Sequence, residues 1–187
     1  SQLIVEEING QKIGNMSIIG IVLPVDFDEA INISIEAIEV YNPVLIISTG
    51  LAGYARCIRI ENIGLNLKCS FNNGKREYSK INPYGPLIYF SSLPTLKVVT
   101  EIRNEGIPAR LSFFAGTYVC NAVMYSILHY INVNNLSIKA GFIHLPPLAT
   151  QTPYGMELNK MIDAIKIAIE SSLDSYYLLS ALFRIHL

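Results

Sequence analysis

Cys120 and His144 are the two side chains in this sequence best placed for covalent chemistry. An apolar, strand-like run gives way at Ala115-Gly116-Thr117 to a helical pattern, so we expect Cys120 in the first turns of a helix. Free N–H groups and the positive end of the helix dipole favour a thiolate there. His144 closes an apolar run just before Pro146-Pro147, which predicts the carboxyl end of a strand. A helix-start thiol and a strand-end imidazole can meet at one rim of an α/β sheet, where the imidazole would activate the thiol as a nucleophile.

A structural interpretation of the same residues remains open at this point. A single cysteine on an apolar helix face is usually a small core residue, and a histidine in an apolar strand can be a satisfied core side chain. Glu61 lies in an extended, largely apolar segment, where it is either a solvated strand residue or a carboxylate with a partner.

Helical and extended patterns alternate around these residues. The sequence predicts strands over residues 17–24, 44–49, 57–66, 87–90 and 109–113 and one ending at 144, and helices over 2–8, 26–41, 94–105, 117–131 and 155–173. Residues 71–84 are rich in Asn, Gly, Lys and Pro and predict a long surface loop. This alternation indicates one α/β domain over residues 1–187, a three-layer α/β/α sandwich with a twisted, largely parallel mixed sheet. Functional residues are expected at the carboxyl ends of its strands.

Composition excludes several function classes. The 187 residues carry 14 basic and 15 acidic side chains without a basic patch, which argues against a nucleic-acid partner. The 16% charged and 51% hydrophobic content suits a sheet buried on both faces or a protomer that hides surface in an oligomer. Three cysteines without CxxC spacing argue against a disulfide scaffold and a zinc ribbon and favour the cytoplasm. There is no twenty-residue apolar run for a membrane span, and no dinucleotide, Walker A or nucleophile-elbow motif.

Several short motifs resemble, in order and spacing, those of type I pyroglutamyl peptidases, also called pyrrolidone-carboxylate peptidases. The resemblance covers roughly residues 1–170. Its motifs are Leu23-Pro24-Val25, Gly50-Leu51-Ala52, Ile60-Glu61 with Asn66, Tyr89-Phe90-Ser91-Ser92-Leu93-Pro94, Gly106-Ile107-Pro108-Ala109, Ala115-Gly116-Thr117-Tyr118-Val119-Cys120-Asn121 with Met124-Tyr125, and Gly141-Phe142-Ile143-His144-Leu145-Pro146.

The resemblance implies a catalytic triad of Cys120, His144 and Glu61 that removes N-terminal pyroglutamate from peptides through an acyl-enzyme. No metal or cofactor is implied. Tyr118 and Val119 are expected to line a slot for the lactam ring, although both also fit an ordinary core. The family consists of homo-oligomers, so a homodimer or homotetramer is expected.

Two departures from the family pattern favour a second hypothesis. Nothing before Ser1 corresponds to the family's opening strand and aromatic loop, so the chain is expected to be N-terminally truncated relative to the family. Lys68-Cys69 also replaces an arginine usually found just past the Asn66 position. The second hypothesis is a truncated or degenerate homologue that keeps the fold and its subunit contacts but is catalytically inactive. Retention of all three triad residue types favours activity.

Overall fold

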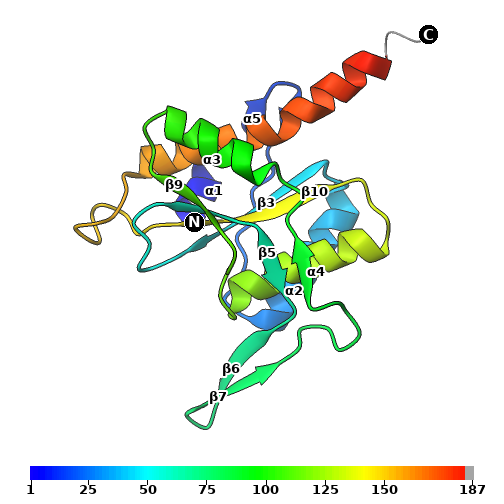
Figure 1. Cartoon of the computed structure of the whole chain (residues 1–187), viewed down its shortest axis with the longest axis vertical. Coiled ribbons are helices and arrows are strands. Elements are labelled where there is room, and N and C mark those ends of the chain that lie inside the picture. The colour runs from blue at the N-terminus through cyan, green and yellow to red at the C-terminus, as the bar shows by residue number, and fades with distance from the viewer. Residues whose placement is uncertain (184–187) are drawn as a thin grey trace.

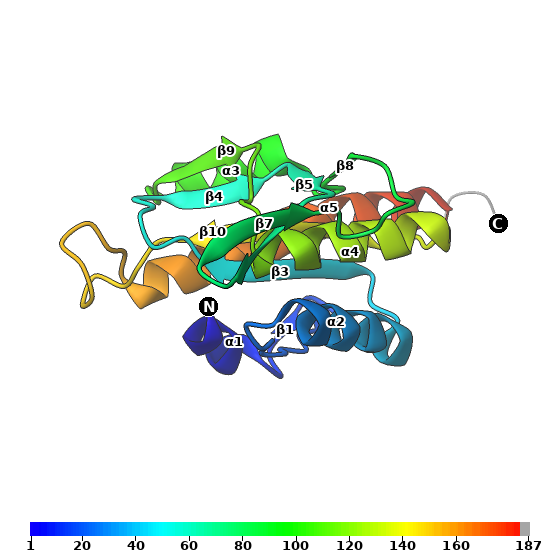
Figure 2. The same ribbon diagram turned by 90° about the horizontal axis from the view of Figure 1, so that it is seen from below.

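A mixed four-stranded sheet forms the centre of the computed structural model, which describes the backbone of residues 1–183 and the side chains of residues 1–174. Figure 2 shows the order from β3 through β10 and β4 to β9. Strand β10 runs parallel to β3 and antiparallel to β4, and β4 runs parallel to β9. The predicted mixed, largely parallel sheet is therefore confirmed. The strands are β3 (Leu45–Leu51), β10 (Lys139–Leu145), β4 (Ile58–Glu61) and β9 (Ala109–Ser112).

Helices cover both faces of this sheet, which confirms the three-layer α/β/α sandwich (Figure 1). Alternation along β10 divides the core, because Ile143 and Leu145 pack with α1, α3 and α5 while Ala140 and Phe142 pack with α2 and α4. The helices are α1 (Gln2–Ile8), α2 (Phe27–Tyr41), α3 (Thr95–Asn104), α4 (Val119–Val133) and α5 (Leu158–Phe183). In residues 1–183 we find no helix with the length and apolar character that crossing a membrane requires.

The strand predicted over residues 17–24 is wrong. A short hairpin of β1 (Lys12–Ile13) and β2 (Met16–Ser17) ends where that strand was expected to begin. The following segment packs on α1 instead of joining the sheet. The Gly20 N–H donates to the Asn9 side chain at 2.9 Å, and a Cβ at Gly20 would lie 2.7 Å from Val5 Cγ1. Close contact with a helix has replaced the strand pairing that the β-branched run suggested.

The loop predicted over residues 71–84 is also wrong, because its first half is a hairpin. Strands β6 (Lys68–Asn72) and β7 (Lys75–Ser79) pair antiparallel and form an arm that extends away from the sheet (Figure 1). Asn73 and Gly74 connect them with φ angles of 49° and 75°, as a two-residue hairpin turn requires. Strands β5 (Ile63–Leu65) and β8 (Ile88–Phe90) pair antiparallel at the base of the arm.

Candidate active site

Cys120 is the second residue of α4, as the sequence predicted. Tyr118 is the N-cap residue and its side chain makes no capping hydrogen bond. The first amide of this turn to bond within the helix is that of Ala122, which donates to the Tyr118 carbonyl at 3.1 Å. The preceding N–H groups and the positive end of the dipole can therefore stabilise a thiolate on Cys120 or an oxyanion beside it.

His144 and Glu61 meet across the antiparallel pair of β10 and β4. Glu61 stands opposite Phe142, one diagonal step from His144, and its Oε1 lies 2.9 Å from His144 Nδ1. The Glu61 side chain is completely buried, so it is not the solvated strand residue of the structural interpretation. Because a carboxylate accepts, Nδ1 carries the hydrogen, and the other ring nitrogen is left for Cys120.

The environment of His144 favours its charged form. Burial by itself would lower the pKa of the imidazole, but the hydrogen bonds to Cys120 and Glu61 and their negative charges raise the pKa to about 9. The ring also lies 4.8 Å from that of Phe142, measured between centroids. A histidine with this pKa keeps its proton at neutral pH and can later give it to a leaving group.

The backbone of Gly50 packs against the sulfur atom of Cys120. It stands directly beside His144 in the parallel pairing of β3 and β10. A Cβ at Gly50 would lie 2.7 Å from Cys120 Sγ and 2.9 Å from Phe142 Cζ. Contacts under 3.0 Å of this kind do not occur in real structures without a shift, so the thiol reaches its place beside His144 because β3 has no side chain here.

We expect Gly50→Ala to lower kcat/KM for the triad's reaction by about ten-fold to a hundred-fold, because a sulfur displaced by even about 1 Å is misaligned with His144. Steady-state kinetics would measure the loss. Gly53→Ala is the matched control, since a Cβ there meets nothing within 4 Å. Combining Gly50→Ala with Phe142→Leu should relieve the clash with the ring but not the clash with the sulfur. The loss in kcat/KM should therefore remain in the double variant. Wild-type kinetics in Gly50→Ala would show that the sulfur does not need this space.

Buried amides tie the start of α4 to the base of the arm, a role that sequence reasoning missed. The Asn121 side chain donates to the carbonyls of Leu65 and Leu67 at 2.9 and 2.8 Å and accepts from the Leu65 N–H at 2.9 Å. Asn66 accepts from the amides of Ile81 and Asn82, both at 2.9 Å. Both asparagines lie within the family-like motifs, and this was the only signal in the sequence that could have pointed to their role. The three bonds of Asn121 fix the residue after Cys120 against the base of the arm, and Asn66 holds the segment that follows the arm.

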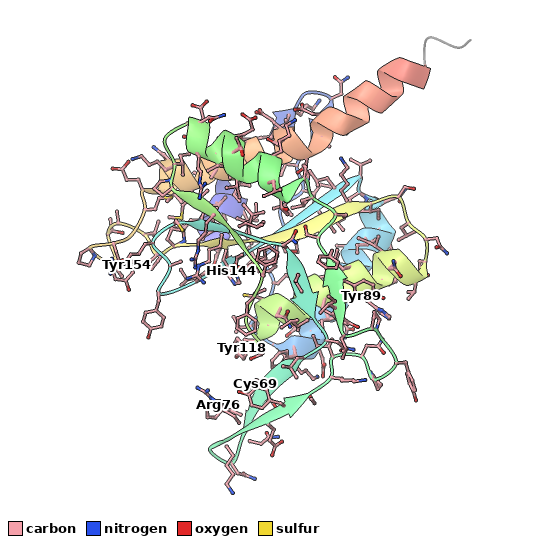
Figure 3. The ribbon with its side chains drawn as sticks, in the orientation of Figure 1. Cys69, Arg76, Tyr89, Tyr118, His144 and Tyr154 are labelled. Atoms are coloured by element: carbon pink, nitrogen blue, oxygen red, sulfur yellow. The ribbon has the colours of Figure 1, made fainter. Side chains whose placement is uncertain are left out.

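The two expected slot residues lie beside Cys120 but in different environments. Tyr118 is 54% exposed, with its ring edge-to-face with Phe27 at 5.3 Å. Val119 is buried among the residues between α2 and α4. Figure 3 labels Tyr118 and His144 near the middle of the molecule and Cys69 and Arg76 on the arm. A role of Tyr118 and Val119 in substrate binding stays a prediction.

Comparison with known proteins points to one family. Residues 1–175 match the family model described as pyroglutamyl peptidase. Pyrrolidone-carboxylate peptidase 1 of Caldanaerobacter subterraneus subsp. tengcongensis is 40% identical over 163 residues, which cover 82% of this chain and 80% of that protein. Pyrrolidone-carboxylate peptidase of Halalkalibacterium halodurans is 34% identical over 183 residues, 91% of this chain and 89% of that protein.

Solved structures of pyrrolidone carboxyl peptidases are similar to this chain as well. Pyrrolidone carboxyl peptidase from Thermococcus litoralis superposes with a TM-score of 0.88 at 33% identity, covering 96% of this chain and 87% of that one. A mutant of pyrrolidone carboxyl peptidase from Pyrococcus furiosus superposes with a TM-score of 0.88 at 34% identity, covering 93% of this chain and 90% of that one.

Proposed function

Because the chain belongs to the pyroglutamyl peptidase family, we propose that it removes N-terminal pyroglutamate from peptides with Cys120, His144 and Glu61 as its catalytic triad. The observation that carries this proposal is the 2.9 Å contact between His144 and the fully buried Glu61, with the sulfur of Cys120 packed against Gly50, the strand partner of His144. A buried carboxylate, an imidazole and a helix-start thiol in this order fit base-assisted thiol catalysis.

In the acylation step, the Cys120 thiolate attacks the carbonyl carbon that joins pyroglutamate to the next residue. The negative charge moves to the carbonyl oxygen, which faces the N–H groups at the start of α4. The protonated His144 then gives its proton to the peptide nitrogen, the C–N bond breaks and the shortened peptide leaves. Pyroglutamate remains on the sulfur as a thioester.

In the deacylation step, a water molecule loses a proton to His144 and attacks the thioester carbonyl. The C–S bond breaks, free pyroglutamate leaves and the thiolate is restored opposite a protonated imidazole. Glu61 keeps Nδ1–H in place and stabilises the charge on the ring in both steps. Tyr118 and Val119 form part of the apolar slot that the lactam ring needs.

The test is hydrolysis of a chromogenic pyroglutamyl amide beside the prolyl and glutamyl amides of the same leaving group. The proposal predicts turnover of the pyroglutamyl compound only, because prolyl lacks the lactam carbonyl and glutamyl lacks the ring. Turnover of none of the three would favour the inactive homologue. Equal turnover of the pyroglutamyl and prolyl compounds would favour a hydrolase with another specificity.

We also propose a homodimer or homotetramer, located in the cytoplasm. The arm and the segment after β9 present exposed aromatic side chains, namely Phe71, Tyr78, Phe113 and Phe114. All three cysteines are free thiols, which suits a reducing compartment. We expect light scattering at micromolar concentration to give at least twice the mass of one chain. A mass equal to one chain at that concentration would contradict the proposed assembly.

A further inference from the structure

Two arginines lie next to His144 on the side away from Cys120. In the pairing of β10 with β4, Arg59 is the direct partner of His144, and in the pairing of β4 with β9, Arg110 is the direct partner of Arg59. Gly50, beneath the sulfur of Cys120, is the partner of His144 on the opposite side. His144 therefore separates the thiol from a pair of cationic side chains on neighbouring strands.

Both arginines project from the same face of the sheet as the triad. Ile58 and Ile60 of β4 point into the core beneath α3 and α5, so Arg59 and Glu61 point to the other face. The same alternation applies to β9, where Ala109 and Leu111 pack in that core. Because the hydrogen bond that His144 Nδ1 donates to Glu61 lies on this face, the arginines share the face with the imidazole.

These cations have no partner among the described residues. Neither Arg59 nor Arg110 makes a side-chain hydrogen bond or an ion pair in residues 1–174. Among those residues, Arg59 Nε is also one of the few buried side-chain nitrogen or oxygen atoms without a hydrogen-bond partner. A buried donor left unpaired is costly, and such a group is expected where a ligand completes its bonding. The planar fork of a guanidinium matches a carboxylate in particular.

We propose that Arg59, assisted by Arg110, binds a carboxylate on the departing part of the peptide substrate. The inference rests on the proposed function, in which His144 protonates the nitrogen at which the departing part begins. Adjacent strands lie about 4.8 Å apart, so the Arg59 side chain starts next to that of His144, the group that protonates this nitrogen. The carboxylate is either the free C-terminus of a short peptide or the side chain of an acidic residue that follows pyroglutamate.

The experiment compares kcat/KM for matched substrates. Pyroglutamyl-alanine against its amide tests the terminal carboxylate, and pyroglutamyl-glutamate amide against pyroglutamyl-glutamine amide tests the side chain. We expect the carboxylate of at least one pair to be preferred about ten-fold by the wild type, the size of one charge-assisted contact. The preference should fall to about one in Arg59→Gln and to an intermediate value in Arg110→Gln. Arg76→Gln, on the arm, is the control and should keep the wild-type preference.

A binding measurement separates this inference from the proposed function. Calorimetry with a Cys120→Ala chain should show tighter binding of pyroglutamyl-alanine than of its amide if the terminal carboxylate is bound. Tighter binding of pyroglutamyl-glutamate amide than of pyroglutamyl-glutamine amide would show that a side-chain carboxylate is bound. A wild type that prefers neither carboxylate in kinetics or in binding overturns the inference, whereas hydrolysis of the neutral pyroglutamyl amide in the same experiment still supports the proposed function. An unchanged preference in a folded Arg59→Gln also overturns it.

Discussion

Cys120→Ala is expected to lower kcat for a pyroglutamyl amide by at least about a thousand-fold. Without the sulfur no thioester can form, and the remaining N–H groups at the start of α4 can only polarise the carbonyl. The substitution removes one atom from a partly exposed position, so the fold should be retained. Measurement of kcat and of the circular dichroism spectrum of the same sample tests both statements.

The other two cysteines provide matched controls for this loss. Cys57→Ala and Cys69→Ala should keep turnover close to the wild-type value, because neither residue lies at the start of a helix beside an imidazole. Limited alkylation at neutral pH, followed by peptide mapping, should label Cys120 first and remove activity in parallel. Loss of activity through labelling of Cys69 alone would contradict the assignment of the nucleophile.

Glu61→Gln is expected to lower kcat by roughly ten-fold to a thousand-fold with little change in KM. The carboxylate stabilises the imidazolium and fixes its orientation, and both effects matter most when the ring is charged in the transition state. A glutamine can still occupy the space and offer an oxygen to Nδ1–H at the 2.9 Å position, so the pair remains hydrogen bonded. Only the negative charge is lost.

The pKa of His144 and the kcat of the folded variant test this prediction. The pKa of His144 should fall in Glu61→Gln, because the negative charge of Glu61 is among the causes that raise it. A purely structural role would lower thermal stability but leave kcat of the folded variant close to the wild-type value. The prediction would be wrong if a folded Glu61→Gln kept wild-type kcat across the range from about pH 6 to pH 8, in which an unperturbed imidazole changes charge.

The positions of the nucleophile and the base within their elements could be predicted because short stretches of sequence encode them. The change from an apolar run to a helical pattern placed Cys120 at the start of α4, and the two prolines placed His144 at the end of β10. The link to Glu61 joins residues separated by 83 positions and depends on the register of β10 with β4, which no short pattern encodes. The resemblance to a family was the only sequence signal for this pairing, and the structure shows the contact itself.

Other features depended on contacts between distant segments. Gly50 lies just past the strand predicted over residues 44–49, and only the sulfur packed against it shows why a side chain is excluded there. Residues 17–24 have strong strand propensity, yet the hydrogen bond of Gly20 to Asn9 holds this segment on α1. The Asn73-Gly74 turn was readable as a hairpin signal and was missed because the polar composition around it resembled a loop.

A titration of His144 by nuclear magnetic resonance tests the central claim most directly. With the ring carbons labelled, His144→Gln identifies its signal among the three histidines of the chain. Because the pKa is raised to about 9, His144 should stay protonated through neutral pH and lose its proton only as the pH rises through about 9. In Cys120→Ala the midpoint should fall, because the hydrogen bond to Cys120 is one cause of the rise. A midpoint close to the ordinary value of about 6.5, unchanged in Cys120→Ala, would contradict the paired thiolate and imidazolium.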